Sequence, residues 1–163
     1  WLEPVEWLGA DLAKTYPLHL ISNQPASRLH SQLDNGIIAQ EAKVAGREAV
    51  TLHPDDAAAR NIKDGDVVRL FNDRGECLAG AVISDGISPG IVQLPTGAWY
   101  DPTRPGQTGS LDKHGNPNIL TRDAGTSSLA QGPTAHSCLV EVEVYEGKPS
   151  PITAFRPPRM ENR

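Results

Sequence analysis

The chain has 163 residues and a formal net charge of −5 at pH 7. This length suits one domain with a sizeable core, and the acidic balance without any basic tract argues against binding to nucleic acid. No apolar run approaches the length of a membrane-spanning helix, and we recognise no signal or transit peptide, so no membrane span is expected.

The composition favours a β-rich fold with many turns, because 15 glycines and 14 prolines accompany little helical periodicity. The two cysteines, Cys77 and Cys138, lack CxxC spacing and a neighbouring histidine pattern typical of zinc. Each falls within an apolar, strand-like run. We therefore expect two buried free thiols and no metal site.

Both ends of the chain have the character of arms that need a surface to pack on. Residues 1–16 carry Trp1 and Trp7 without an evident apolar partner nearby, and residues 147–163 are rich in proline. We expect these arms to flank one domain, residues 17–146. We also expect the chain to be a piece of a longer polypeptide.

The first predicted strand is Leu18 to Ile21, which ends at the turn sequence Ser22-Asn23-Gln24-Pro25. The polar segment Arg28 to Gln32 follows. Its arginine has a planar fork suited to a phosphate or a carboxylate, and His30 and Ser31 can donate to anionic oxygens. The alternative is a solvated loop with an ordinary surface arginine.

A short helix is predicted to begin at Pro54, because proline suits the first helical position. Asp55 and Asp56 favour the positive end of the helix dipole, which explains them better than a catalytic carboxylate pair does. Asn61 is predicted to end the helix in the left-handed conformation.

The middle of the chain alternates strand-like runs with turns, which suits a small closed barrel because closure removes exposed strand edges. A hairpin is predicted at residues 72–75, with Gly75 at a positive φ angle. A second turn is predicted at residues 88–90. The expected strands are residues 67–71, 77–83 and 91–94.

Trp99 and Tyr100 interrupt this rhythm, since two adjacent aromatic residues between glycine and proline cannot both face the core of a regular strand. One of them could cover the face of a ligand. The equally weighted alternative is that Trp99 closes one end of the barrel.

The segment from His114 to Gly132, HGNPNILTRDAGTSSLAQG, is crowded with amides, hydroxyls and glycines and leads into the last predicted strand, residues 136–145. A long polar segment within a compact domain is usually functional or disordered. Because Ile119, Leu120 and Leu129 provide apolar anchors, we expect a rigid loop that offers uncharged hydrogen-bonding groups to a large polar ligand. Disorder is the alternative.

Several motifs together resemble the C-terminal molybdopterin-dinucleotide-binding domain of the dimethyl sulfoxide reductase family of molybdenum enzymes. They cover most of the chain and are similar above all to the biotin sulfoxide, trimethylamine N-oxide and dimethyl sulfoxide reductase branch. The motifs are RLHSQL at 28–33, HPDDAAARNIKDGDVVRLFNDRG at 53–75, LAGAV at 78–82, GAWYDP at 97–102, HGNPNILT at 114–121 and GTSSLAQGPTAHSCLVEVE at 125–143.

This resemblance implies a mainly β fold, a six-stranded double-psi β-barrel with short helices, that clamps one bis(molybdopterin guanine dinucleotide) cofactor with its molybdenum. Asn61 departs from the glycine usual in the family but keeps the same backbone option. The metal-ligating side chain of the family lies in domains outside this sequence. The implied partners are therefore the remaining N-terminal domains of the same enzyme, an S-oxide or N-oxide substrate, and an electron donor that the resemblance does not name.

The resemblance also implies that the segments around residues 22–32 and 116–136 meet at one rim of the barrel and bind the nucleotide end of the cofactor. Every candidate would position the cofactor, and none would act as an acid, base, nucleophile or metal ligand. The candidates are Ser22, Asn23, Gln24, Arg28, Leu29, His30, Ser31, Gln32, Trp99, Tyr100, Asn116, Asn118, Gln131 and His136.

Two other functions are weighed against this one. Double-psi barrels also serve as interaction modules, so a free-standing barrel could bind a protein partner and no cofactor. The domain could instead belong to a formate dehydrogenase or nitrate reductase, although the RLHSQ and HGNPN forms argue against that. The stretches ISNQP and LAGAVIS favour the biotin sulfoxide type, which implies a cytoplasmic enzyme, whereas the other relatives of this branch are typically periplasmic.

Overall fold

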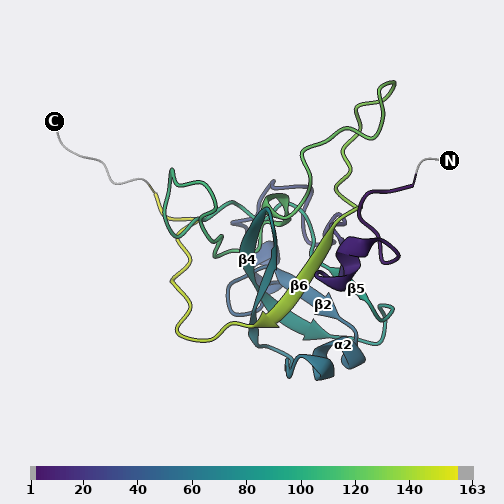
Figure 1. The fold of residues 1–163 in the computed structure, drawn as a ribbon. Coiled ribbons are helices and arrows are strands. Elements are labelled where there is room, and N and C mark those ends of the chain that lie inside the picture. The colour runs from purple at the N-terminus through teal and green to yellow at the C-terminus, as the bar shows by residue number, and fades with distance from the viewer. Residues whose placement is uncertain (1–2, 158–163) are drawn as a thin grey trace.

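The computed structural model describes residues 3–157 as a closed six-stranded β-barrel with a few short helices (Figure 1). Around the barrel the strands follow the order β1-β5-β2-β4-β3-β6. The strands are β1 (Leu18–Ile21), β2 (Ala49–Leu52), β3 (Val67–Asn72), β4 (Gly75–Ile83), β5 (Ile91–Gln93) and β6 (Leu139–Val144). The helices are the 3₁₀ segments η1 (Asp11–Lys14) and η2 (Pro117–Ile119) and the α-helices α1 (Ile37–Glu41) and α2 (Pro54–Ala59). Trp1 and residues 158–163 of the predicted C-terminal arm lie outside the described residues.

The barrel combines two parallel strand pairs with antiparallel neighbours. β1 is parallel to β5 and β2 is parallel to β4, while the other four neighbouring pairs are antiparallel. The prediction of a mainly β, double-psi barrel with short helices is confirmed.

The interior of the barrel is the hydrophobic core. Successive strand residues point to opposite faces, so Leu18 and Leu20 of β1 are buried while His19 between them is partly exposed. β4 departs from this alternation, because residues 77–81 are all buried. Its outer face is covered, since a Cβ atom at Gly80 would overlap with the side chain of Val44. Both cysteines are free and buried, as predicted.

The short helix α2 begins and ends as the sequence predicts. The ring Nδ1 of His53 accepts a hydrogen bond from the backbone N–H of Asp55 at 3.1 Å, which caps the helix. Pro54 is its first residue, and Asp55 and Asp56 occupy the first turn. Asn61 has φ +56°, the left-handed conformation expected just after the helix.

Two local predictions are wrong. Gly75 was expected at a positive φ angle, but it is the first residue of β4 and pairs with Asn72. It is a glycine because a Cβ atom there would lie 3.0 Å from the backbone oxygen of Ile119. The last strand begins at Leu139 and not at residue 136, because a turn closed by the hydrogen bond from Ser137 N–H to Thr134 C=O precedes it.

The segments before and after the barrel pack back onto it. The carboxylate of Glu6 is almost fully buried, and it accepts two hydrogen bonds from Arg74, at 2.7 and 2.9 Å, and one from the N–H of Leu139 at 2.9 Å. On the C-terminal side, Phe155 packs edge-on against the ring of Trp99 with centroids 5.3 Å apart. Among the described helices, none has the length and apolar character needed to cross a bilayer.

Candidate functional site

Three strand ends meet at one end of the barrel. Because β1 and β5 are parallel, their carboxyl ends lie together, and their pairing continues beyond the strands as Thr96 N–H donates to Asn23 C=O at 2.9 Å. β6 is antiparallel to β1, and Leu20 N–H donates to Cys138 C=O at 2.9 Å. The loop after β1, the loop after β5 and the segment before β6 therefore share one rim.

A groove made of two adjoining pockets, of about 450 and about 770 Å³, follows this rim. His30, Thr96 and Asn118 line both pockets. The first pocket is completed by Ser31, Gly97, Ala98, Trp99, Tyr100 and Asn116. The second is completed by Ser22, Gln24, Thr121, Arg122, Asp123, Pro133, Ala135 and His136. The two distant parts of the chain thus meet at one rim, as expected, and most of the lining side chains are polar and uncharged.

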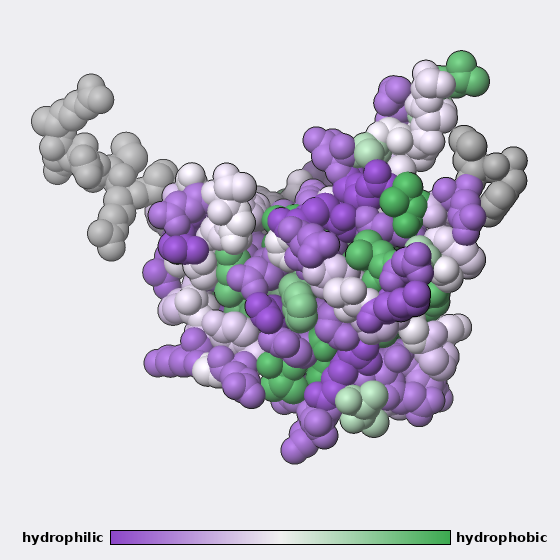
Figure 2. All heavy atoms as spheres, in the orientation of Figure 1, coloured by the Kyte–Doolittle hydropathy of each residue, from purple (hydrophilic) through white to green (hydrophobic). Residues whose placement is uncertain are grey.

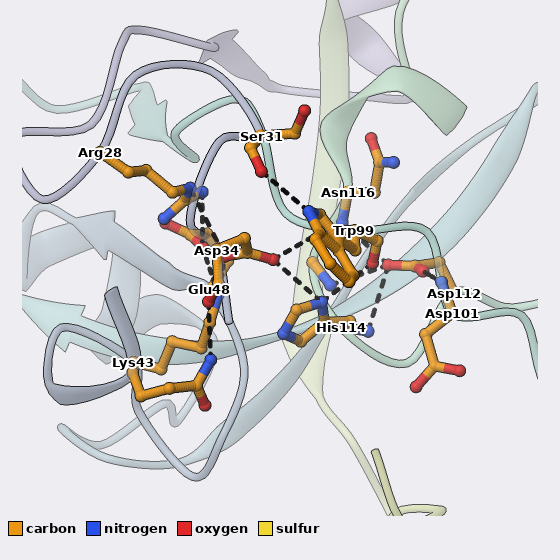
Figure 3. Close-up of polar contacts among 12 residues, drawn as sticks. Arg28, Ser31, Asp34, Lys43, Glu48, Trp99, Asp101, Asp112, His114 and Asn116 are labelled. Carbon is orange, nitrogen blue, oxygen red and sulfur yellow. Dashed lines mark hydrogen bonds and ion pairs between the residues drawn. The ribbon is translucent and has the colours of Figure 1, made fainter. Parts of the chain in front are cut away.

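A buried cluster of four charged side chains holds the loop after β1 (Figure 3). Arg28 makes a two-point contact with Glu48, at 3.0 and 3.3 Å. Lys43 lies 2.8 Å from Asp34 and 2.9 Å from Glu48, and Arg28 lies 3.4 Å from Asp34. With two positive and two negative groups the cluster is neutral, which is how buried charges are tolerated.

Arg28 also connects this cluster to the groove. Its Nε donates to the carbonyl of His30 at 3.1 Å, and its Nη2 donates to the carbonyl of Thr96 at 3.0 Å. His30 and Thr96 are two of the three residues that line both pockets. The sequence suggested a phosphate or a carboxylate as the partner of the Arg28 guanidinium, and the structure provides a carboxylate, that of Glu48. Through the two carbonyls, Arg28 also fixes the loop after β1 relative to the loop after β5.

The aromatic wall of the groove is fixed from three sides. The indole Nε1 of Trp99 donates to the carbonyl of Ser31 at 2.8 Å, and its backbone N–H donates to Asp34 at 2.9 Å (Figure 3). The ring Nδ1 of His114 donates to the Trp99 carbonyl at 2.9 Å. Trp99 and Tyr100 are 37% and 51% exposed, and both line the first pocket.

The turn that carries Asn116 is held by the fully buried carboxylate of Asp112. One oxygen accepts hydrogen bonds from the backbone N–H groups of His114, Gly115 and Asn116, at 3.2, 2.7 and 2.8 Å. Asn116 in turn caps η2, because its side-chain oxygen accepts from the N–H of Asn118 at 3.0 Å. The first part of the predicted polar loop is therefore an ordered, partly buried structure.

The second part of that loop projects from the barrel. Residues 123–134 form an irregular hairpin closed by a bridge between Gly125 and Pro133, and it stands out in Figure 1. Leu129 lies in the turn closed by the hydrogen bond from Ser127 N–H to Ala130 C=O and is 97% exposed. Figure 2 shows a hydrophobic end on this projection. Gln131 lies within this hairpin and donates to the Ser127 carbonyl at 3.0 Å.

The predicted site residues fall into three groups by position. Nine line the groove: Ser22, Gln24, His30, Ser31, Trp99, Tyr100, Asn116, Asn118 and His136. Arg28 and Asn23 lie directly beneath its edge, and the side-chain oxygen of Asn23 is buried without a hydrogen-bond partner among the described residues. Leu29, Gln32 and Gln131 are exposed and line neither pocket.

Sequence reasoning missed several residues of the groove and its support. Thr96, Thr121, Arg122 and Asp123 line the pockets but were not among the candidates, although the last three belong to the polar segment 114–132 that was expected to face a ligand. Arg122 is the only one of these that could have been found by type, as an arginine within a stretch of neutral polar residues. Asp34, Glu48 and Asp112 carry no local signal, because only the fold brings them to their partners.

A family model described as "Molydopterin dinucleotide binding domain" matches residues 18–139. Over 98% of its length the chain is 50% identical to dimethyl sulfoxide/trimethylamine N-oxide reductase from Cereibacter sphaeroides. It is 51% identical to trimethylamine-N-oxide reductase 1 from Escherichia coli K12 over 94% of its length, and 49% identical to biotin sulfoxide reductase from Cereibacter sphaeroides over 90%. The chain spans about a fifth of the length of these curated relatives, 18 to 19%.

A solved structure with the same fold is that of acetylene hydratase from Pelobacter acetylenicus. The superposition has a TM-score of 0.66 and covers 89% of this chain and 21% of that protein. The sequence identity is 19%, so this likeness concerns the fold.

Proposed function

Since the chain belongs to the molydopterin dinucleotide binding domain family, we propose that its rim groove seats the nucleotide end of bis(molybdopterin guanine dinucleotide). The observation that carries this is the meeting of the loop after β1, the loop after β5 and the residues around η2 at one polar groove. Two adjoining pockets of about 450 and about 770 Å³ are within the range of small-molecule and cofactor sites.

The side chains of the groove suit a ligand with a neutral heteroaromatic end and an anionic linker. Amides present both donors and acceptors, so Asn118, Gln24 and the unpaired buried oxygen of Asn23 match the edge of guanine. His30, His136 and Arg122 offer donors for a pyrophosphate. Trp99 and Tyr100 provide aromatic surface for a flat ring.

The other predicted contacts take different places in the proposal. Arg28 supports the groove edge through the carbonyls of His30 and Thr96. Leu29, Gln32 and Gln131, which line neither pocket, would reach the cofactor only through a different arrangement of their segments. We take the cofactor-binding unit to be residues 17–146, with residues 1–16 and 147–163 as arms.

The whole enzyme would reduce an S-oxide or N-oxide by oxygen-atom transfer. The molybdenum of the bound cofactor would supply the redox chemistry, and this domain would supply binding and orientation. The names of the relatives at about 50% identity favour this branch over formate dehydrogenases and nitrate reductases. The isolated 163-residue chain would then lack reductase activity, and turnover by it would contradict this division.

A sharp test compares two amide substitutions in the full-length enzyme. Asn118→Ala removes a groove amide, while Gln107→Ala removes an exposed amide outside both pockets. Losing one hydrogen bond to the cofactor should cost about 1–3 kcal/mol. We therefore expect Asn118→Ala to speed the loss of cofactor on dilution by roughly fivefold or more, measured as guanosine monophosphate and molybdenum retained per polypeptide.

A third single substitution, His136→Ala, is compared with these two, because His136 lines the same pocket as Asn118. Retention in the Asn118→Ala and His136→Ala enzymes equal to that of Gln107→Ala would reject the groove as the binding site. The competing function is an interaction module without cofactor. It predicts that the purified full-length protein shows no pterin absorption and carries no stoichiometric molybdenum.

The proposed enzyme type also bears on the cellular compartment of the enzyme. A biotin sulfoxide reductase type predicts a cytoplasmic enzyme, and the alternative is a periplasmic one. Sequencing the gene upstream of this domain tests the choice, since a twin-arginine signal would support the periplasmic alternative.

A further inference from the structure

The segment from Leu29 to Gln40 has an inverted distribution of polarity. Its single charged side chain, Asp34, is fully buried, whereas its large aliphatic side chains are on the surface. Their exposed fractions are 57% for Leu29, 75% for Leu33, 77% for Ile37 and 70% for Ile38. Folding alone would place these groups the other way round.

This exposed surface also lacks charge. Eight residues of the segment are exposed, and none of them is Asp, Glu, Lys or Arg. They are Leu29, His30, Ser31, Gln32, Leu33, Asn35, Ile37 and Ile38. Depletion of charged residues together with large apolar side chains characterises the centre of a protein–protein interface, and not an ordinary solvated surface.

The segment is rigidly held in this inverted arrangement. Asp34 contacts Lys43 at 2.8 Å, accepts from the N–H of Trp99 at 2.9 Å, and its carbonyl accepts from the side chain of Gln40 at 2.7 Å. Leu33 has φ +57°, a conformation that costs a non-glycine residue energy. The fold therefore maintains a strained backbone that displays the aliphatic side chains outward.

We propose that this aliphatic surface, the side chains of Leu29, Leu33, Ile37 and Ile38, docks against an apolar face of the same polypeptide outside the 163 residues of this sequence. The curated relatives are about five times as long as this chain, which spans 18 to 19% of their length. The surface borders the groove, because His30 and Ser31, which lie between Leu29 and Leu33 in the chain, line the first pocket. The docking rests on the proposed function only in taking the domain to be part of a longer enzyme.

The test uses the full-length polypeptide with the photoreactive residue p-benzoylphenylalanine at Ile37, at Leu33, or at Ala59 as the control. Ala59 is exposed on α2, at the opposite end of the barrel in Figure 1. After irradiation and digestion, we expect cross-links within one polypeptide from Ile37 and Leu33 to residues outside this sequence, and none of these from Ala59. Cross-links to a second copy, to residues within this domain only, or to none would overturn the docking.

A second readout does not depend on where a cross-linker reaches. Ile38→Cys in the native full-length enzyme should react with a maleimide at least tenfold more slowly than Ala59→Cys, whereas both should react equally in urea. Equal native rates would also reject the docking. Neither measurement depends on bound cofactor, so a covered surface in an enzyme without pterin would reject the proposed function and leave the docking in place.

Discussion

Gly97 packs directly on the backbone of His30, so closely that a Cβ atom at Gly97 would overlap with the His30 carbonyl group. Gly97 also has φ +98°, which glycine adopts readily and other residues adopt rarely and at an energetic cost. This contact makes the loop after β1 and the loop after β5 into one wall of the groove, which no side chain at position 97 would allow.

Replacing Gly97 by alanine should therefore destabilise the protein more than a matched replacement elsewhere. Gly106 has φ +79° with no atom within 4 Å of a built Cβ, so Gly106→Ala should cost only about 1–2 kcal/mol of conformational energy. Gly97→Ala adds a steric term of about 1–3 kcal/mol. Urea unfolding of the two variants measures the difference, and equal losses would contradict the packing described.

Arg28 provides a second comparison, because its fork joins Glu48, His30 and Thr96. Arg28→Lys keeps the charge but loses the two-point geometry, and it should cost about 2–4 kcal/mol since buried polar groups lose their partners. Arg104→Lys, at an exposed arginine, is the control and should change the free energy of unfolding by less than about 0.5 kcal/mol. A similar effect of both substitutions would show that the buried cluster does not organise the rim.

His114 gives the stability a predictable dependence on pH. Burial, with a smaller contribution from Lys43, lowers the pKa of its ring below the ordinary 6.5. As the pH falls below 6.5, the unfolded chain takes up a proton that the folded chain does not, so stability is lost in that direction. His114→Gln removes this uptake, and its free energy of unfolding should fall less steeply between pH 6.5 and 5 than that of the unsubstituted protein. Parallel curves would contradict the prediction.

The parts of the fold that local chemistry determines were predictable from the sequence. Residues 18–21 end at a turn sequence, and Pro54 and Asn61 bracket α2, so these elements lie where they were expected. β2 was not predicted, because its four residues, Ala49–Leu52, follow two charged residues and become a strand through pairing with β4 and β5. α1 was missed for a similar reason, since its exposed isoleucines give no amphipathic pattern.

The candidate site was predictable in part, and for a different reason. The resemblance indicated which segments meet, and nine of the fourteen candidate residues line the groove. It could not indicate that Arg28 is tied to Glu48 or that Asp112 holds the turn at His114, since these contacts join residues distant in sequence or depend on a buried carboxylate. Which groove residues contact a cofactor stays a prediction.

The two thiols should be chemically silent in the native protein. Burial raises the pKa of Cys138 to about 11, although Arg74 acts in the opposite direction, and burial also raises the pKa of Cys77 well above its ordinary value. Because the thiolate is the reactive form, neither side chain should react with iodoacetamide at pH 8 in the folded protein, whereas both should react once urea unfolds it. An introduced thiol, Ala59→Cys, is the positive control at an exposed position. Modification of Cys138 at the rate of the control would mean that the chain opens in solution just before β6. Such opening would be incompatible with the hydrogen bonds that the Glu6 carboxylate accepts from Arg74 and from the N–H of Leu139.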